Sequence, residues 1–277
     1  MNNTLLYASL VYLVVLVAAA AAAPLVAPFD PFTQDLGARF VAPGVEGHPL
    51  GTDDFGRDVA SRLIYGARAT LTVGFTAVGI ALSLGLVIGL SAGLSEGLPD
   101  SALMLVMDAV LSFPTVLLAI TVVTIFGYGL AQVMVAVGVI FTPVFARLVR
   151  AETLAVKREE YVEASRALGS PPLRTIRLHI LPNVLPQIVV QASITFALAV
   201  VIEASLSFLG LGTQPPNPSW GLMLKDARNY LLRAPGLALY PGIAVALTVL
   251  SLNIIADWLS NRFSASARVQ QRAYSRR

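Results

Sequence analysis

Three acidic residues, Asp108, Glu203 and Asp257, interrupt long apolar stretches of this sequence. A charge is costly in lipid, so acids in such stretches face a protein interior or an aqueous path. Catalysis there would need a nucleophile beside a base, or a pair of acids. These three acids lie in separate stretches and share no motif, and His48 and His179 belong to no metal-binding or catalytic cluster. The sequence therefore predicts no catalytic residue and no metal site.

The composition indicates the environment of these acids. Of the 277 residues, 56% are hydrophobic and 13% are charged, and the mean hydropathy is +0.74. Soluble domains average about 25% charged residues, so this chain has too little polar surface to coat a globule in water. A bilayer removes that difficulty. The lack of cysteine excludes disulfides and thiolate metal ligands, and a net charge of +3 gives no sign of nucleic-acid binding.

Six apolar stretches are long enough to span a membrane, which takes roughly 20 residues. They are residues 5–23, 69–95, the two halves of 109–146, 183–210 and 234–256, and a Gly-rich turn at 126–129 divides the third from the fourth. A cleaved signal peptide is the alternative for the first stretch, whose Ala-rich end precedes Pro24. That stretch lacks a basic amino-terminal region and is long for a signal sequence. We therefore expect an uncleaved span.

Basic residues are distributed unevenly between the two sides that six spans define. Twelve of the nineteen fall within 147–177 or after residue 259, whereas those on the other side are matched by seven acids. Lys and Arg accumulate on the cytoplasmic side. We predict a multi-pass protein of the cell (inner) membrane, surrounded by membrane lipid, with both termini in the cytoplasm. The basic tail either contacts anionic lipid or is simply solvated.

The cytoplasmic loop at about 147–182 predicts two short helices. Helical spacing gives the first, residues 159–168, a weakly apolar face, and Gly169 suits its C-terminal cap. The members of that face are Tyr161, Ala164, Ser165 and Leu168. Ser170 is expected to cap a second helix over 171–180, which Leu181 and Pro182 end. Such a rigid pair suits docking into a groove of another protein, and the alternative is a hairpin that packs only on its own span.

Two sequence runs in this loop carry a family resemblance. Glu163-Ala-Ser-Arg-Ala-Leu-Gly169 and His179-Ile-Leu-Pro182 resemble the Glu-Ala-Ala motif of permease subunits in ATP-binding-cassette (ABC) importers. Ser165 replaces the second Ala of that motif, and His179 stands where many members have Ile. One departure lies elsewhere, because the turn Ser95-Glu-Gly-Leu-Pro-Asp100 replaces a Gly-Gly-rich turn that is common in the family.

Further motifs extend the resemblance over nearly the whole chain. They are similar to the dipeptide/oligopeptide/nickel branch of these permeases, and specifically to its C-type subunit. The motifs are His48-Pro-Leu-Gly-Thr-Asp-Asp-Phe-Gly-Arg-Asp58, Tyr65-Gly-Ala-Arg68, Ser112-Phe-Pro114, Glu160-Tyr-Val-Glu163, Glu203-Ala-Ser-Leu-Ser-Phe-Leu-Gly210 and residues 215–220.

The resemblance implies a fold and a division of the chain. The expected fold is all-α, with six transmembrane helices arranged as in the type I (MetI-like) importer permeases. Residues 1–66 would form the first transmembrane helix and an external segment, and 67–277 a five-helix permease core with coupling helices at about 159–180. Those helices would contact the ATPase, with Glu163 and Gly169 holding their bend. The residues assigned to this coupling are Tyr161, Glu163, Ala164, Ser165, Gly169, Leu181 and Pro182.

The resemblance also implies partners. These are a second permease subunit in a heterodimer, one or two cytosolic ATPase subunits that bind ATP and Mg, and an extracytoplasmic solute-binding protein. This chain itself would hold no cofactor, since neither of its two lysines, Lys157 and Lys225, lies in the Gly-Lys-Ser/Thr loop that cradles phosphates. Di- and oligopeptides are the expected substrates, with nickel chelates, glutathione, sugars or another small solute as alternatives. A secondary transporter would often show an internal repeat, and none is visible.

Four residues are candidates for the pathway or for contacts between subunits: Asp108, Pro114, Glu203 and Ser207. Asp108 either has a transport role or simply reaches the interface. Glu203 either contributes to the path or forms a buried hydrogen bond to the partner subunit. Pro114 is expected to kink the third span.

Overall fold

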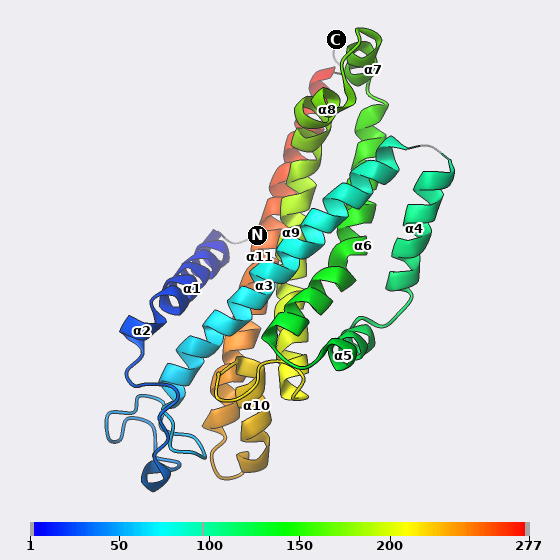
Figure 1. Cartoon of the computed structure of the whole chain (residues 1–277). Helices are drawn as coiled ribbons and strands as arrows, with labels where there is room; N and C mark the ends of the chain where they lie inside the picture. Colours follow the sequence, from blue (N-terminus) through cyan, green and yellow to red (C-terminus); the bar gives the residue numbers. More distant parts are fainter. Residues whose placement is uncertain (1–2, 96, 275–277) are drawn as a thin grey trace.

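The computed structural model describes residues 3–95 and 97–274, and its regular secondary structure is helical (Figure 1). The longer helices are α1 (Asn3–Ala21), α3 (Val59–Leu94), α4 (Leu98–Leu111), α5 (Thr115–Phe126), α6 (Leu130–Lys157), α7 (Glu160–Ala167), α9 (Leu181–Phe208), α10 (Trp220–Ala227) and α11 (Gly236–Tyr274). The short elements are α2 (Ala23–Val26), α8 (Pro172–Thr175), the 3-10 turns η1 (Leu36–Ala38) and η3 (Arg228–Tyr230), and the π-helical turn η2 (Ile176–Ile180). An isolated β-bridge joins Thr52 to Asp58. The predicted all-α fold is confirmed.

The packing of α3 against α6 forms the centre of the molecule. A Cβ atom added at Gly85, Gly89 or Gly93 of α3 would lie less than 3.0 Å from atoms of α6. Glycine at these positions therefore lets the two backbones approach closely, as small residues do between membrane helices. Gly138 of α6 meets Ile80 of α3 in the same way. A long stretch of buried side chains continues along both helices on either side of these glycines.

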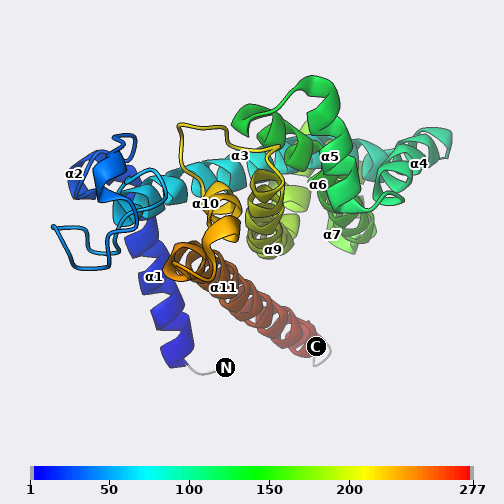
Figure 2. The same ribbon diagram turned by 90° about the horizontal axis from the view of Figure 1, so that it is seen from below.

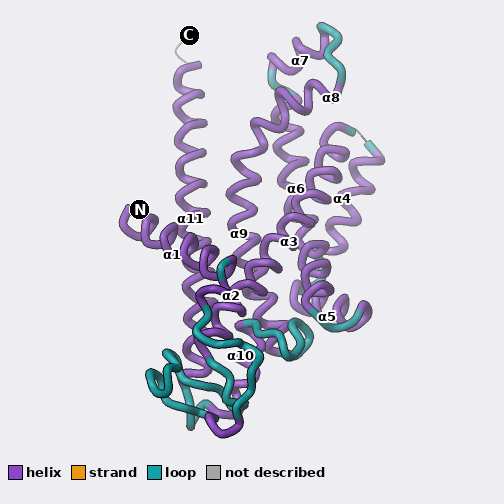
Figure 3. Tube along the Cα trace, turned by 60° about the vertical axis from the view of Figure 1, so that its left-hand side comes forward, coloured by secondary structure: helices purple, strands orange, loops and turns teal. Residues whose placement is uncertain are grey.

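The remaining long helices surround this pair. Helix α9 packs against α3, α6 and α11, and Phe196 occupies the space left by Gly74. Helix α1 lies at one edge of the molecule beside α11, as Figures 2 and 3 show. The Tyr12 hydroxyl joins these two helices by donating to the carbonyl of Ala244, 3.2 Å away. Because few side chains of α1 are buried within the chain, most of its surface is left for lipid or a partner.

The predicted six spans correspond to five long apolar helices and one broken pair. The five are α1, α3, α6, the helical run Pro172–Phe208, and α11 up to Phe263. The pair is α4 and α5, whose axes differ by 92°. The sequence predicts a third span over 109–126 with a kink at Pro114, but α4 begins at Leu98 and the chain breaks fully at 112–114. Pro114 lacks a backbone N–H and caps the start of α5, so the break is sharper than a kink.

The segments outside the spans gather at two opposite ends of the molecule. Helices α7 and α8 lie at one end with the C-terminal part of α11, whereas the loop 27–58 and α10 lie at the other (Figure 1). These are the groupings that the charge distribution predicts for the two sides of a membrane. Arg276 and Arg277 of the basic tail lie outside the described residues, as does Glu96 of the turn before α4.

Two boundaries predicted from the sequence fall inside helices. Helix α3 starts at Val59, with the Asp58 carboxylate accepting from the Ser61 N–H at 2.7 Å, and continues without a break. The proposed domain boundary at residue 66 therefore falls inside α3. Leu181 and Pro182, which were expected to end the second short helix, lie within a helix instead, since α8 continues through η2 into α9.

The π-helical turn gives a physical reason for the continuous helix. The Leu181 N–H donates to the Ile176 carbonyl five residues back, which widens the helix where a proline ring would otherwise clash with the preceding turn. The Asn183 side chain then donates to the carbonyl of His179 at 2.6 Å. Pro182 is thus accommodated within a helix rather than stopping one.

Candidate functional site

The first candidate site is the helical hairpin formed by α7, α8 and η2. Gly169 has a φ of +84°, the left-handed conformation of a helix C-cap, and the Ser170 N–H donates to the carbonyl of Ser165 at 3.1 Å. The predicted glycine cap is confirmed. Ser170 does not cap the following helix as predicted, because that helix begins at Pro172 with no side-chain cap. Its hydroxyl instead accepts from that of Ser165 at 2.9 Å.

A second set of contacts fixes the hairpin to the end of α9. The side-chain amide of Asn183 donates to the Tyr161 hydroxyl at 3.2 Å, and the rings of Tyr161 and His179 pack edge to face at 5.6 Å. Val162 is fully buried and belongs to the main apolar core. The hairpin is therefore held at its base, while its tip extends away from the bundle (Figure 3).

The tip of the hairpin exposes large apolar side chains. Leu168, Leu173 and Leu178 are 89%, 75% and 55% exposed. Glu163 and Ala164 are also exposed, and Ser165 is half-buried. Exposed leucines on a short, capped element that projects from a bundle are typical of a surface that another protein covers. Hydrophobic periodicity indicated Leu168, whereas Leu178 lies on η2, whose π-helical geometry was not predicted from the sequence.

Glu203 lies inside the chain, on α9, with no exposed surface. Its two carboxylate oxygens accept from the Ser207 hydroxyl at 2.8 Å and from the Thr70 hydroxyl of α3 at 3.2 Å. The Ser207 oxygen in turn accepts from the Thr213 N–H at 3.1 Å. Two of the pathway candidates, Glu203 and Ser207, are thereby brought together in one internal network that ties α9 to α3 and to the following loop.

Asp108 lies elsewhere, on an exposed part of α4. It forms an ion pair with Arg147 of α6 at 2.5 Å, and both side chains are about half exposed. Asp100, at the other end of α4, pairs in the same way with Arg150. The two ion pairs bridge α4 to α6. Neither Asp108 nor Pro114 approaches the Glu203 network.

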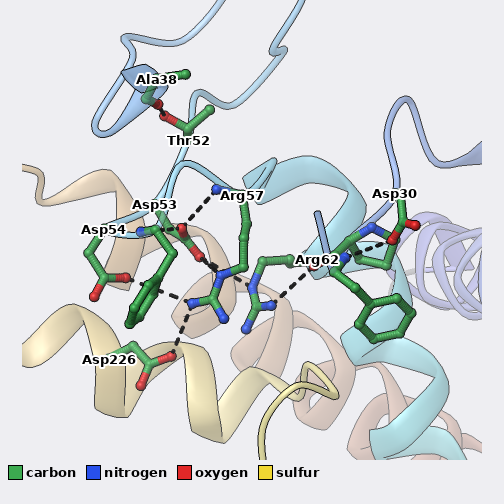
Figure 4. Close-up of polar contacts among 11 residues, drawn as sticks. Asp30, Ala38, Thr52, Asp53, Asp54, Arg57, Arg62 and Asp226 are labelled. Atoms are coloured by element: carbon green, nitrogen blue, oxygen red, sulfur yellow. Dashed lines mark hydrogen bonds and ion pairs between the residues drawn. The ribbon is translucent and has the colours of Figure 1, made fainter. Parts of the chain in front are cut away.

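A buried ionic cluster at the opposite end was not predicted from the sequence (Figure 4). Asp53 accepts from the Arg57 side chain at 2.7 Å and lies 3.4 Å from Arg62. Arg57 also lies 3.8 Å from Asp54 and 3.7 Å from Asp226 of α10. Arg62 donates to the Pro31 carbonyl at 3.2 Å. This cluster links the loop 27–58, the start of α3 and α10. It is called the external cluster because the charge distribution predicts that this end lies outside the cell.

Burial perturbs the acids of the external cluster. It raises the pKa of Asp54, with the neighbouring Asp53 carboxylate acting in the same direction, and it raises the pKa of Asp226 against the opposing effect of Arg57. Asp53 also accepts from the N–H groups of Phe55 and Arg57 in a turn, and Asp58 caps the start of α3. Within residues 3–95 and 97–274, no three His, Cys, Asp or Glu side chains gather as a metal site.

Comparison with known proteins identifies the family of the chain. The family described as "Binding-protein-dependent transport system inner membrane component" matches residues 85–269, which include the α7–α8 hairpin. The chain belongs to this family. A second match, over residues 1–43, is to the N-terminal transmembrane domain of oligopeptide transport permease C. This second match confirms the expected C-type permease character.

Curated members of the family cover most of the chain. The dipeptide transport system permease protein DppC of Alkalihalophilus pseudofirmus is 42% identical over 221 residues, which are 80% of this chain and 72% of the relative. A di/tripeptide transport permease of Pseudomonas aeruginosa is 40% identical over 90% of this chain and 84% of its own length. The glutathione transport permease GsiD of Shigella flexneri is 45% identical over 76% of this chain and 70% of its own length.

Solved structures support the same fold. An inward-facing MetNI methionine ABC transporter has a chain that matches 73% of this one, and 95% of its own length, with a TM-score of 0.59 at 20% identity. An amino acid ABC transporter matches 73% of this chain and 94% of its own, with a TM-score of 0.56 at 17% identity. The chain is thus a multi-pass permease of the MetI-like fold, a membrane component of a transport system.

Proposed function

We propose that this chain is one of two membrane-spanning subunits of an ATP-driven importer of di- and oligopeptides. The observation that carries the proposal is the capped hairpin α7–α8, which exposes Leu168 and Leu173 at the end of the molecule opposite the external cluster. Family membership supports it, because the family consists of membrane components that depend on a binding protein. The peptide substrate is supported by relatives named for dipeptide and peptide transport.

The hairpin is proposed to receive the movement of a cytosolic ATPase that binds ATP and Mg. Tyr161, Glu163, Ala164, Ser165, Gly169, Leu181 and Pro182 are assigned to this coupling. Their placement supports two separate roles. Glu163 and Ala164 lie on the exposed part of α7, where a partner can contact them. Tyr161, Leu181 and Pro182 lie at the base, where η2 and α9 would transmit the movement into the bundle.

The proposed assembly has this chain in a heterodimer with a second permease, served by one or two ATPase subunits and an external solute-binding protein. Both termini and the hairpin would lie in the cytoplasm of a cell whose inner membrane holds the complex. The exposed apolar side chains of α4 and α5 support a second membrane subunit on that face. Leu105, Phe113 and Ile125 there are 70%, 61% and 71% exposed. Hydrolysis of ATP is assigned to the partners, and this chain supplies half of the path.

Reconstitution tests the proposal. The chain is expected to co-purify with an ATPase subunit and, with its binding protein in proteoliposomes, to import peptides only when ATP is present inside. Uptake by this chain alone, or uptake without ATP, would contradict it. Glutathione is the second substrate to compare, since the identity with a glutathione permease is as high as with the dipeptide permeases. Uptake of glutathione and not of peptides would change the proposed substrate to glutathione, and the assignment as a subunit of an ATP-driven importer would stand.

A further inference from the structure

A polar groove opens on the external end of the molecule, separate from the external cluster and from the Glu203 carboxyl. It has a volume of about 660 Å³, within the range of small-ligand sites. Four segments enclose it: the loop 27–58 at Phe32, α3 near its start, the turn between α5 and α6, and the loop between α9 and α10. The side chains used below are those of Tyr65, Arg68, Tyr128, Thr213, Gln214 and Asn217.

Arg68 differs from the other arginines at the start of α3. Arg57 and Arg62 are buried and surrounded by carboxylates of the external cluster. Arg68 is exposed and lines the groove, and no ion pair joins it to an acid among the described residues. A guanidinium in that position presents a planar set of donors, which matches the two oxygens of a carboxylate.

A second observation comes from the floor of the groove. Thr213 is 3% exposed, and its hydroxyl has no hydrogen-bond partner within the described part of the chain, although its N–H donates to Ser207. A buried polar group without a partner is costly and rare. Thr213 lines the same groove as Arg68, but its hydroxyl is covered in this conformation. Rotation of the side chain about its Cα–Cβ bond would let the hydroxyl donate to an acceptor oxygen that a ligand brings beside Arg68.

We propose that this groove binds the C-terminal carboxylate of the peptide on its way into the membrane, with Arg68 and Thr213 as the donors. The proposal rests on the proposed function, since the ligand is the transported peptide. Other walls of the groove suit the same ligand. Asn217 offers a carboxamide to peptide N–H and C=O groups, and Tyr65 and Tyr128 offer aromatic surface. Gln214 holds the loop in place by donating to the carbonyls of Gly210 and Gly212.

Saturation-transfer NMR on the whole complex in nanodiscs, without binding protein, tests the site directly. The probes are trialanine and trialanine C-terminal amide, which differ only in the carboxylate. Trialanine is expected to receive about tenfold more saturation than its amide from the wild-type complex, and the Arg68→Gln variant should abolish that difference. Arg228→Gln is the matched control, because Arg228 is exposed on the same end but does not line the groove. Equal saturation of the two probes by the wild type would overturn the proposal.

Two substitutions at Thr213 keep the test independent of folding. Thr213→Val removes a hydroxyl that has no partner, so the midpoint temperature of thermal unfolding of the complex should stay unchanged or rise slightly. The saturation of trialanine should fall about threefold or more. Thr213→Ser keeps the hydroxyl and should restore binding. Loss of stability in Thr213→Val, with no specific loss of trialanine binding, would show a purely structural threonine and overturn its assignment.

The alternative occupant of the groove is an acidic surface of the binding protein. In that case Arg68→Gln would raise the concentration of binding protein that half-saturates ATPase stimulation, and saturating binding protein would restore uptake. We expect the half-saturating concentration to stay unchanged and uptake to fall about tenfold at saturation. If the wild-type complex imports trialanine and its C-terminal amide equally well, this inference alone is contradicted. If the complex imports no peptide in the presence of ATP, the proposed function is contradicted.

Discussion

The two ends of the molecule are built on opposite principles. The external end is fixed by buried charges, since Asp53, Arg57 and Arg62 are each less than 9% exposed and tie distant segments together. The α7–α8 hairpin is stabilised locally, by a glycine cap and a pair of serines, and it leaves leucines exposed. The first arrangement suits a fixed surface for incoming ligands, and the second suits an element that a partner grips and moves. The four experiments below test this contrast.

The largest effect is expected from Arg57→Met in the external cluster. The substitution leaves Asp53 and its neighbours buried without their cation, and breaking a buried pair in this way costs about 3–5 kcal/mol of unfolding free energy. Thermal unfolding can be followed by the fluorescence of Trp220, which is buried at this end and donates to the Leu63 carbonyl at 2.9 Å, in a Trp258→Phe background. Arg228→Met is the control. A loss below about 1 kcal/mol would show that the cluster is not what fixes this end.

A loss of function without a loss of stability is expected from Gly169→Val. The φ of +84° at this position is strained for residues with a side chain, by about 1–2 kcal/mol. The hairpin cap should be disrupted, so that ATPase stimulation and uptake fall about tenfold while the Trp220 unfolding transition stays in place. Gly169→Asn is the matched control, because Asn tolerates this conformation better. An equal defect in both variants would point to side-chain bulk at the ATPase contact rather than to the cap.

A smaller effect is expected from Ser165→Ala, which restores the alanine of the family motif. It removes the hydroxyl contact to Ser170, worth about 0.5–1.5 kcal/mol. Hydrogen exchange should quicken several-fold at the amides of residues 165–170 and stay constant elsewhere. Ser170→Ala should reproduce the change, and the double variant should add nothing to it. Additive effects would show that the two serines act separately.

The smallest effect concerns pH and the external cluster. Burial raises the pKa of Asp226, so the folded state binds its proton more tightly than the unfolded state does. The free energy of unfolding at this end should therefore rise as pH falls through the raised folded pKa, and level off below the unfolded value of about 3.9. Asp226→Asn should flatten this part of the pH profile, measured by Trp220 fluorescence between pH 7 and pH 4. A free energy of unfolding that decreases as the pH is lowered from 7 to 4 would contradict the sign.

Much of the fold could be predicted because a membrane span depends on the hydropathy of consecutive residues. Uncharged stretches indicated six spans, and the uneven distribution of Lys and Arg separated the segments that gather at the two ends of the molecule. The glycine cap at Gly169 was predictable for the same reason, since a cap depends on one or two neighbouring residues. The effects of proline were predicted less well. Pro182 was expected to stop a helix and lies within one, whereas Pro114 was expected to kink a span and instead separates two helices that meet at 92°.

The candidate sites divide in the same way. The hairpin residues lie within about twenty positions of one another, so a motif could indicate them. The external cluster joins Asp53 to Asp226, and the internal network joins Glu203 to Thr70, across separations that no local pattern encodes. Glu203 illustrates the limit: the sequence places a charge in an apolar span, but only its neighbours decide whether it faces a path, a partner or its own chain.

The sequence by itself determined that this chain has about six apolar spans and to which family it belongs, and it predicted which loop faces the proposed ATPase. These properties follow from hydropathy, charge and short motifs, each of which acts over a few turns of helix. The tertiary structure alone decided which charges are buried together and which remain available to a ligand. Arg57, Arg62 and Arg68 lie on one short segment, yet three acids surround the first two, and the third lines an open groove. The reason is physical, because pairing depends on distance in space, which the packing of α3 against the loops sets.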